Sequence, residues 1–189
     1  MRSVLACLLL ATACTSSADP TGDDTDQTPG GGTVDAADAI SATVSVSDDG
    51  GDSSHALILI ASTSNLCNDV DSVDRKGQHF ISIALRDING STRSAPTAPG
   101  TYTIYPNTGS EPAKSASLNV GGYDNTCQLD DDISASGQRG TVTLTSATGG
   151  VYKGSYDVTL NSGSHITGTF APTACPKLAT ATDSGHSCL

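Results

Sequence analysis

The sequence predicts an all-β fold, an antiparallel β-sandwich of about seven to eight strands. Apolar residues alternate with polar ones along most of residues 37–189, and Gly, Pro and Asn-Gly turn signals separate the alternating segments. No stretch of ten residues in this region has a helical period. Ser and Thr make up 49 of the 189 residues, which suits exposed strand faces. A small up-and-down or Greek-key β-barrel is the alternative arrangement.

Residues 1–13 have the features of an export signal. Arg2 gives a positive start, and residues 4–11 form an apolar run far shorter than the ~20 residues of a transmembrane helix. Residues 11–14, Ala-Thr-Ala-Cys, place small residues directly before Cys14. We therefore expect residues 1–13 to be removed as a signal peptide. An ordinary signal peptide followed by a coincidental cysteine is the alternative.

This ending resembles the lipobox of bacterial lipoproteins, over residues 1–14. The resemblance implies that the thiol of Cys14 carries a diacylglycerol, so that two or more acyl chains anchor the protein stably to a membrane. Thr15 stands where Asp commonly retains such proteins in the inner membrane, which implies an outer-membrane location. Residues 99–102, Pro-Gly-Thr-Tyr, and the strand-rich C-terminal part are similar to uncharacterised Gram-negative envelope lipoproteins with a β-rich domain.

Residues 14–36 comprise the expected lipidated cysteine and an acidic linker. Residues 15–36 contain five Asp, two Pro and three consecutive Gly, with no basic or aromatic residue. Such a composition buries too little apolar surface to offset its ordering entropy. We predict a disordered spacer that holds the domain roughly 25 Å from the lipid. An acidic interaction tail is the alternative interpretation.

Residues 37–189 form the single expected domain. Residues 56–61, ALILIA, are apolar at every position, which predicts a central strand covered on both faces. Asn89-Gly90 predicts a hairpin with a type I′ turn, and Pro96 and Pro99 exclude a central strand between them. Residues 139–170 predict an antiparallel meander. The alternating segments that predict the other strands are 40–46, 81–85, 102–104, 116–120, 142–144, 152–160 and 166–170.

Four cysteines remain in the domain, since Cys7 leaves with the signal and Cys14 is lipidated. An even number in an exported chain predicts two disulfides, with three possible connectivities. We expect one bridge to join two polar, Asp-rich loops and the other to fold the C-terminal tail back onto the last strand. A zinc site is the competing interpretation, but it favours Cys-x-x-Cys pairs, which the sequence lacks. The expected bridges are Cys67–Cys127 and Cys175–Cys188.

The chain is acidic, with 20 acidic and 9 basic residues and a net charge of −11. Nucleic acids and anionic lipid headgroups need clustered Lys and Arg, so we exclude them as main partners. We expect no cofactor. Three acidic clusters, at 48–52, 68–74 and 130–132, are predicted to be solvated turns, with Ca²⁺ sites as the alternative. The last two adjoin Cys67 and Cys127, so the expected bridge would bring their carboxylates together.

The sequence contains no motif that predicts catalysis. It lacks His-Glu-x-x-His, Gly-x-Ser-x-Gly and phosphate-binding loops. Three histidines, His55, His79 and His165, each open an expected strand, where a polar residue is ordinary. The tail residues 183–186, Asp-Ser-Gly-His, are interpreted as a solvated turn, because catalytic triads are assembled from distant segments.

The sequence therefore predicts a lipid-anchored, non-enzymatic binding or structural module of the cell envelope. Its ligand would be a protein or a glycan, and Tyr105 and Tyr123 are the outward tyrosines that could face a carbohydrate. A small envelope hydrolase is one alternative, and it would show a polar catalytic cluster in a concave pocket. A β-barrel carrier of an apolar ligand is the other, and it would show an apolar cavity that side chains do not fill.

Overall fold

The structure is a computed structural model that describes residues 34–48, 51–181 and 186–189. The expected signal peptide, Cys14, the linker up to residue 33 and residues 183–184 lie outside the described residues. No helix in the described ranges has the length and apolar character needed to cross a membrane.

The described residues fold almost entirely into β-strands, which confirms the predicted all-β class. Eight strands have five residues or more, and four shorter ones have two or three. In chain order the elements are β1 (Asp38–Asp48), β2 (Gly51–Ala61), α1 (Leu66–Asp69), β3 (Val73–Asp74), β4 (His79–Asn89), β5 (Thr92–Ser94), β6 (Gly100–Ile104), β7 (Lys114–Gly122), β8 (Ala135–Thr148), β9 (Val151–Leu160), β10 (His165–Phe170), β11 (Thr173–Ala174), the 3₁₀ helix η1 (Pro176–Ala179) and β12 (Ser187–Cys188).

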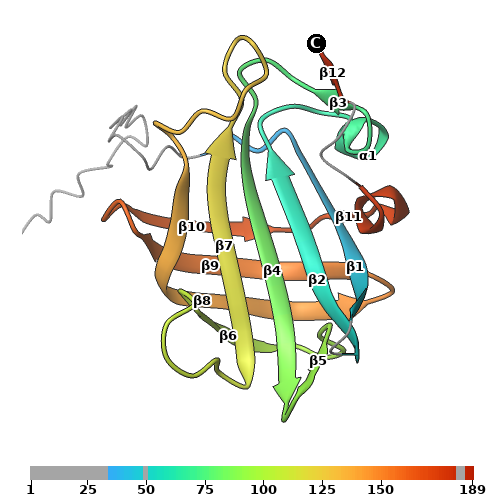
Figure 1. The fold of residues 1–189 in the computed structure, drawn as a ribbon, viewed down its shortest axis with the longest axis vertical. Helices are drawn as coiled ribbons and strands as arrows, with labels where there is room; N and C mark the ends of the chain where they lie inside the picture. The colour runs from blue at the N-terminus through green and yellow to red at the C-terminus, as the bar shows by residue number, and fades with distance from the viewer. Residues whose placement is uncertain (1–33, 49–50, 182–185) are drawn as a thin grey trace, which may run out of the picture.

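Ten strands form one continuous sheet, in the order β10-β9-β8-β6-β7-β4-β2-β1-β11, with β5 beside β4. The sheet curls over itself, so that β1, β2, β4 and β7 cross in front of β8, β9 and β10 as a half-barrel (Figure 1). The predicted meander of β8, β9 and β10 is antiparallel, as expected. Two pairings, β6–β7 and β1–β11, are parallel instead. The first arises because residues 105–113 carry the chain back along the sheet before β7 begins.

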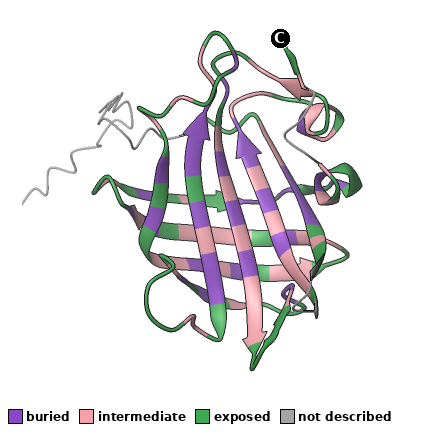
Figure 2. Ribbon diagram, in the orientation of Figure 1, coloured by how far each residue is buried: buried purple, intermediate pink, exposed green. Residues whose placement is uncertain are grey.

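The main core lies between the two crossing halves of the sheet. Ile58 of β2, Ile83 of β4 and Leu118 of β7 point inward and are at most 1% exposed. They pack with Tyr102 of β6 and Val158 of β9. The residues between them along β4 and β7 face outward and are more exposed, which gives the alternating colours of these strands in Figure 2. The alternation of apolar and polar residues in the sequence therefore corresponds, as expected, to strands with one buried and one more exposed face.

A second apolar cluster covers the outer face of β1 and β2, and we call it the outer cluster. The two short helices supply Leu66 and Leu178, which pack onto β1. Leu57 and Leu59 pack against it from β2, while the alternate residues of β2 lie in the main core. The prediction that 56–61 is covered on both faces is thus confirmed. The buried members of the outer cluster are Ile40, Ala42, Ala61, Leu66, Cys175 and Leu178.

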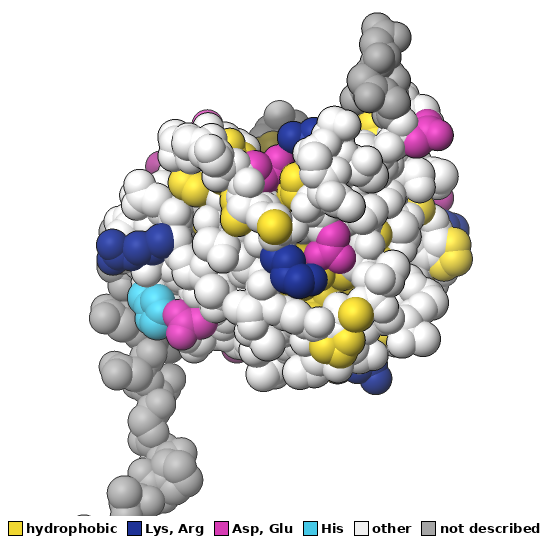
Figure 3. All heavy atoms as spheres, turned by 90° about the horizontal axis from the view of Figure 1, so that it is seen from below, with side chains coloured by type: hydrophobic (Ala, Val, Ile, Leu, Met, Phe, Trp, Pro, Cys, Tyr) yellow, Lys and Arg dark blue, Asp and Glu magenta, His cyan; other side chains and the backbone are white. Residues whose placement is uncertain are grey.

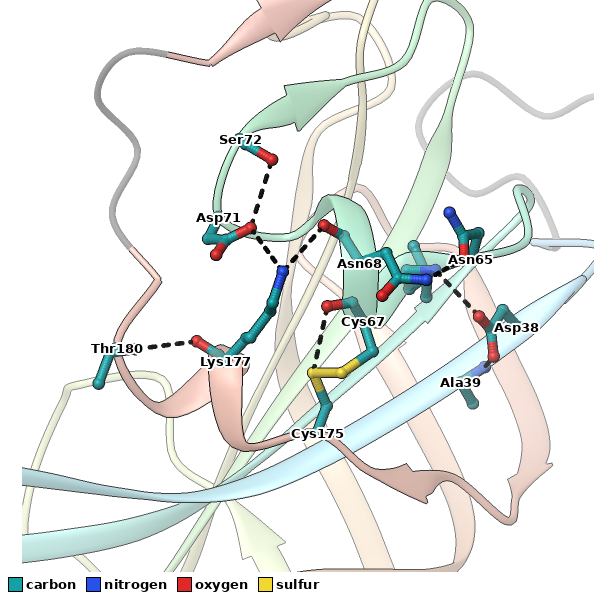
Figure 4. Close-up of a disulfide and its surroundings, with 11 residues drawn as sticks. Asp38, Ala39, Asn65, Cys67, Asn68, Asp71, Ser72, Cys175, Lys177 and Thr180 are labelled. Atoms are coloured by element: carbon teal, nitrogen blue, oxygen red, sulfur yellow. Dashed lines mark hydrogen bonds and ion pairs between the residues drawn. A yellow bond between two sulfur atoms is a disulfide. The ribbon is translucent and has the colours of Figure 1, made fainter.

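The four domain cysteines form two disulfides, but the expected connectivity is wrong. The bridges are Cys67–Cys175 and Cys127–Cys188. Figure 4 shows the first one joining α1 to the start of η1. The cause is the parallel pairing of β11 with β1: Cys175 N–H donates to the Ser41 carbonyl at 2.8 Å, which brings Cys175 beneath α1. Spacing along the chain carries no information about this pairing.

The second disulfide ties the C-terminus to the loop after β7. β12 runs parallel to β3, and the Leu189 N–H donates to the Asp74 carbonyl at 3.0 Å. The Sγ atom of Cys127 lies 3.5 Å from the same carbonyl oxygen. Cys127 is therefore next to Cys188 rather than Cys67. Two disulfides are typical of a protein exported from the reducing cytoplasm.

Turns connect the strands where the sequence places them, with one change of type. The hairpin between β4 and β5 forms, but Asn89 pairs with Thr92, so its two-residue loop is Gly90-Ser91. Only Gly90 has a positive φ, 63°, as a type II′ turn requires, and the expected type I′ turn is wrong. The sequence pattern predicts Asn89 in the loop, whereas in the structure it is the last paired residue of β4.

Candidate functional site

A groove of about 540 Å³ lies on the outer face of the sheet, and we call it the outer groove. Its volume falls within the roughly 300–1,000 Å³ typical of ligand sites. The strand positions at its centre, such as Ala84 of β4 and Ser117 of β7, alternate with the inward residues of the main core. Its lining comprises Ala84, Arg86, residues 105–108, residues 115–119, residues 136–138 and Asn161.

The groove forms where the sheet is incompletely paired. β6 ends at Ile104, opposite Ala116 of β7, and β8 joins β7 only at the pairs Asn119–Ser136 and Val120–Ala135. Between these points, at Ser117 and Leu118, this edge of β7 has no ladder pair with either strand. A register irregularity in β8 between Gly137 and Arg139 lies at the same place. Bulges of this kind redirect side chains, and here Gln138 lines the groove.

Arg86 is the charged side chain of the lining, and it stands at one end of the groove. Its side chain is 38% exposed, and its guanidinium makes an ion pair with Glu111, Nη1 to Oε1, at 3.8 Å. Arg93 binds the other oxygen of Glu111 with two hydrogen bonds of 3.2 and 2.9 Å. Within the described ranges, the Arg86 guanidinium donates no hydrogen bond to protein. Two guanidinium groups face one carboxylate here, so the formal local charge is about +1.

The single glutamate is therefore part of a charged cluster beside the groove. Its side chain is 13% exposed, and Oε1 is buried without a hydrogen-bond partner in the described structure. His55 of β2 belongs to the same neighbourhood. Burial, and then the positive charge of Arg86, lower the pKa of His55 below its ordinary value. The His55 imidazole therefore takes up a proton less readily than a free histidine does.

A network of amides and hydroxyls stands at the opposite end of the groove. The Ser136 backbone N–H donates to Asn161 Oδ1 at 3.1 Å, and the Asn161 N–H donates to the Ser136 carbonyl at 2.8 Å. The Ser136 hydroxyl also donates to Asn119 Oδ1 at 2.9 Å. A backbone N–H can only donate, so the Asn161 oxygen is fixed and its NH₂ is left as a donor. That NH₂ makes no hydrogen bond to another described residue.

Tyr105 forms a side wall of the groove. Its backbone N–H donates to the Ala116 carbonyl at 2.8 Å, which holds the start of the loop against β7. Its hydroxyl donates to the Gly109 carbonyl at 3.2 Å, which fixes the half-buried ring within its own loop. Asn107, between them, has a positive φ of 61°, a conformation that Asn tolerates. The outward position predicted for Tyr105 is thus where the structure has it.

Other residues considered from the sequence do not come together. Among the described residues there is no group of three or more His, Cys, Asp or Glu that could hold a metal. In the acidic loop at 68–74, Asp69 is paired with Arg75 and Asp71 with Lys177, and Asp74 lies 2.9 Å from the ring of His186. The Cys67–Cys127 bridge that would have joined this loop to 130–132 does not form.

The predicted positions of the histidines need one correction. His79 and His165 open β4 and β10 as expected, but His55 lies within β2, because that strand begins at Gly51. Tyr123 packs against Phe80 with ring centroids 5.7 Å apart, and it is not part of the groove lining. The tail His186 donates to or accepts from Asp74 at 2.9 Å, in a structural contact beside β3.

Sequence reasoning missed Arg86, Asn119, Ser136 and Asn161 as site residues. A signal was present in the polar outward positions of β4 and β7, where Ser115, Ser117 and Asn119 alternate with core residues. On the face seen from below, charged side chains are scattered singly or in pairs of opposite sign among uncharged atoms (Figure 3).

Comparisons of the chain with protein-family models, curated proteins and solved structures found no match.

Proposed function

We propose that this protein is a lipid-anchored, non-enzymatic binding module of the cell envelope, and that it binds its ligand in the outer groove. The observation that carries the proposal is that hydrogen-bond donors at both ends of the groove donate to no described residue. At one end the Arg86 guanidinium makes an ion pair with Glu111 at 3.8 Å but donates no hydrogen bond to a described residue, and at the other end the Asn161 NH₂ donates none either. Fixed donors that are not used within the protein favour a polar ligand, because they need no reorganisation on binding.

The lining supports binding better than the alternatives do. Its polar side chains are hydroxyls, amides and one guanidinium, and the rest are small or apolar. The polar groups can form hydrogen bonds with a ligand, but they are weak general bases at neutral pH. A carrier of apolar ligands would use an apolar cavity. A more apolar cavity, beside Ile60, Ile81 and Ile166, has about 190 Å³, below the usual ~300 Å³ for a ligand pocket.

The anchor part of the proposal rests on the export signal and Cys14. Replacing Cys14 by Ser removes the acylated sulfur but keeps the size of the side chain. We expect the Cys14→Ser protein to lose fatty-acid labelling and to appear in the soluble periplasmic fraction, whereas the unmodified protein sediments with the outer membrane. Equal membrane partitioning of the two proteins would refute lipid anchoring at Cys14.

The binding part is tested with a substitution that fills the groove. Ser117→Tyr adds a ring at the centre of the lining, at an outward strand position that tolerates Tyr. Ser45→Tyr is the matched control, because Ser45 is an exposed strand residue of β1 outside the groove. Both are made in the Cys14→Ser protein, so that lipid does not drive sedimentation. We expect isolated envelopes to co-sediment the control and not the filled variant. Equal sedimentation of both variants, or of neither, would refute groove binding.

A further inference from the structure

From the chemistry of the outer groove we infer its ligand class: an oligosaccharide that carries an acidic group, bound with that group against Arg86. The inference rests on the proposed binding function and specifies its ligand. It starts from the unequal ends of the groove, one positively charged and the other neutral and rich in amides and hydroxyls. A ligand that matches both ends must itself be polar throughout and anionic at one end.

The charged end is arranged to receive an acid. Arg86 lies 3.8 Å from Glu111, an ion-pair distance that leaves its N–H groups without a hydrogen bond in the described structure. Glu111 is held independently by two hydrogen bonds from Arg93. The guanidinium can therefore bind a ligand oxyanion in the two-pronged geometry that arginine favours, while Arg93 keeps its two hydrogen bonds to Glu111 Oε2. The overall negative charge opposes this only weakly, because charges beyond about 8–10 Å are screened at physiological salt.

The neutral end is arranged for hydroxyl groups. Asn119, Ser136 and Asn161 are linked in one network, and Ser117 lies between them and the Arg86–Ser115 pair. Hydroxyls and amides both donate and accept, so they suit sugar hydroxyls, which do the same. Tyr105, whose ring is half-buried, is also part of the lining, and an aromatic ring suits the apolar face of a sugar ring.

The length of the groove favours several sugar units over one. Arg86 pairs with Ser115 in the β4–β7 register, and Asn119 is four residues further along β7. At ~3.3 Å per residue this separates the two ends by about 13 Å. An extended acidic peptide would span the same distance. It is the less favoured occupant, because it places alternate side chains toward the sheet, and the lining meets them with hydroxyls and amides instead of apolar pockets.

The test compares two ligands that differ in their carboxylates: α-1,4-linked trigalacturonic acid and neutral α-1,4-galactotriose. Affinities are measured by calorimetry for the unmodified protein, Arg86→Gln, Arg86→Lys and the control Lys153→Gln. Lys153 is exposed on β9 outside the groove. Lys153→Gln changes the net charge by the same amount as Arg86→Gln, without altering the groove. Charge-assisted hydrogen bonds correspond to about a tenfold or larger effect on affinity. A glycan array with sialylated, sulfated and phosphorylated arms identifies the acidic group if it is not a uronate.

We expect an acidic arm to bind at least tenfold more tightly than its neutral counterpart. Arg86→Gln should abolish that preference, Arg86→Lys should retain part of it, and Lys153→Gln should change affinity less than twofold. Equal binding of acidic and neutral glycans, or no glycan binding in any arm, would overturn the inference. If envelopes still bind in a groove-dependent way in those cases, the proposed binding function stands and only its ligand class fails.

Discussion

The Cys67–Cys175 disulfide should contribute more to stability than Cys127–Cys188, and the structure gives the reason. The first bridge closes a loop with a sequence separation of 108 residues, and Cys175 is 1% exposed within the outer cluster. It joins the two short helices that cover β1. The perturbation is the double substitution Cys67→Ala/Cys175→Ala, which removes the bridge without leaving a free thiol.

The magnitude follows from loop closure in the unfolded chain. For a separation of 108 residues, the chain-entropy relation gives about 4.8 kcal/mol at 25 °C. For the separation of 61 residues closed by the second bridge, it gives about 4.3 kcal/mol. The structure predicts a larger difference between the two stability losses than these values give. The second bridge secures only the terminal strand β12, whose Ser187 and Cys188 are exposed. Its loss can release the tail while both apolar clusters stay packed.

Thermal unfolding followed by far-ultraviolet circular dichroism measures the difference. A loss of about 4–5 kcal/mol lowers the melting temperature by roughly 10–20 °C in a domain of this size. We expect this fall for Cys67→Ala/Cys175→Ala and a clearly smaller one for Cys127→Ala/Cys188→Ala. Peptide mapping without reduction must also link Cys67 to Cys175. A loss below about 1 kcal/mol for the first variant, or a larger loss for the second, would refute the reasoning.

Two further predictions concern a histidine and a glycine. Burial and Arg86 lower the pKa of His55 from its ordinary 6.5, so the unfolded state binds the extra proton first. The free energy of unfolding should then fall as pH drops through 6.5 and level off below the folded pKa, and His55→Gln should lessen that fall; identical pH profiles would contradict this. Gly168 of the edge strand β10 pairs with Tyr156, and a Cβ there would lie 2.4 Å from the Tyr156 hydroxyl oxygen. Gly168→Ala should therefore cost about 1–3 kcal/mol, while the exposed Thr169→Ala should change stability by less than about 0.5 kcal/mol; equal unfolding midpoints would show that the ring moves freely.

The fold class was predictable because it depends on local patterns. The alternation along 81–85 and 116–120 and the two-faced run at 56–61 each specify which side chains are buried, whatever strand lies beside them. The hairpin at Gly90 is likewise a local feature. The curl of the sheet into a half-barrel was not predictable, since it depends on how β6 returns to β7 through residues 105–113.

The disulfides and the groove depend on contacts between distant segments. Cys175 meets Cys67 because β11 pairs with β1, a parallel contact between segments more than 100 residues apart in sequence. Ser136 and Asn161 meet through the β8–β9 ladder and its turn, 25 residues apart. The outward polar positions of β7 were visible in the sequence, but which strand would end beside them was not. The outer groove is therefore a property of the topology.

The most direct test of the binding account is an NMR titration of the uniformly ¹⁵N-labelled Cys14→Ser protein with the tightest acidic glycan arm. We predict that the backbone amide shifts concentrate at residues 84–86, 105–108, 115–119, 136–138 and 161, which line the outer groove. The Arg86 side-chain Nε–H resonance should also shift, and its titration curve should give the same dissociation constant as the backbone amide shifts. Shifts confined to other surfaces, such as the loops around the two disulfides, or no shifts at saturating ligand, would contradict the account.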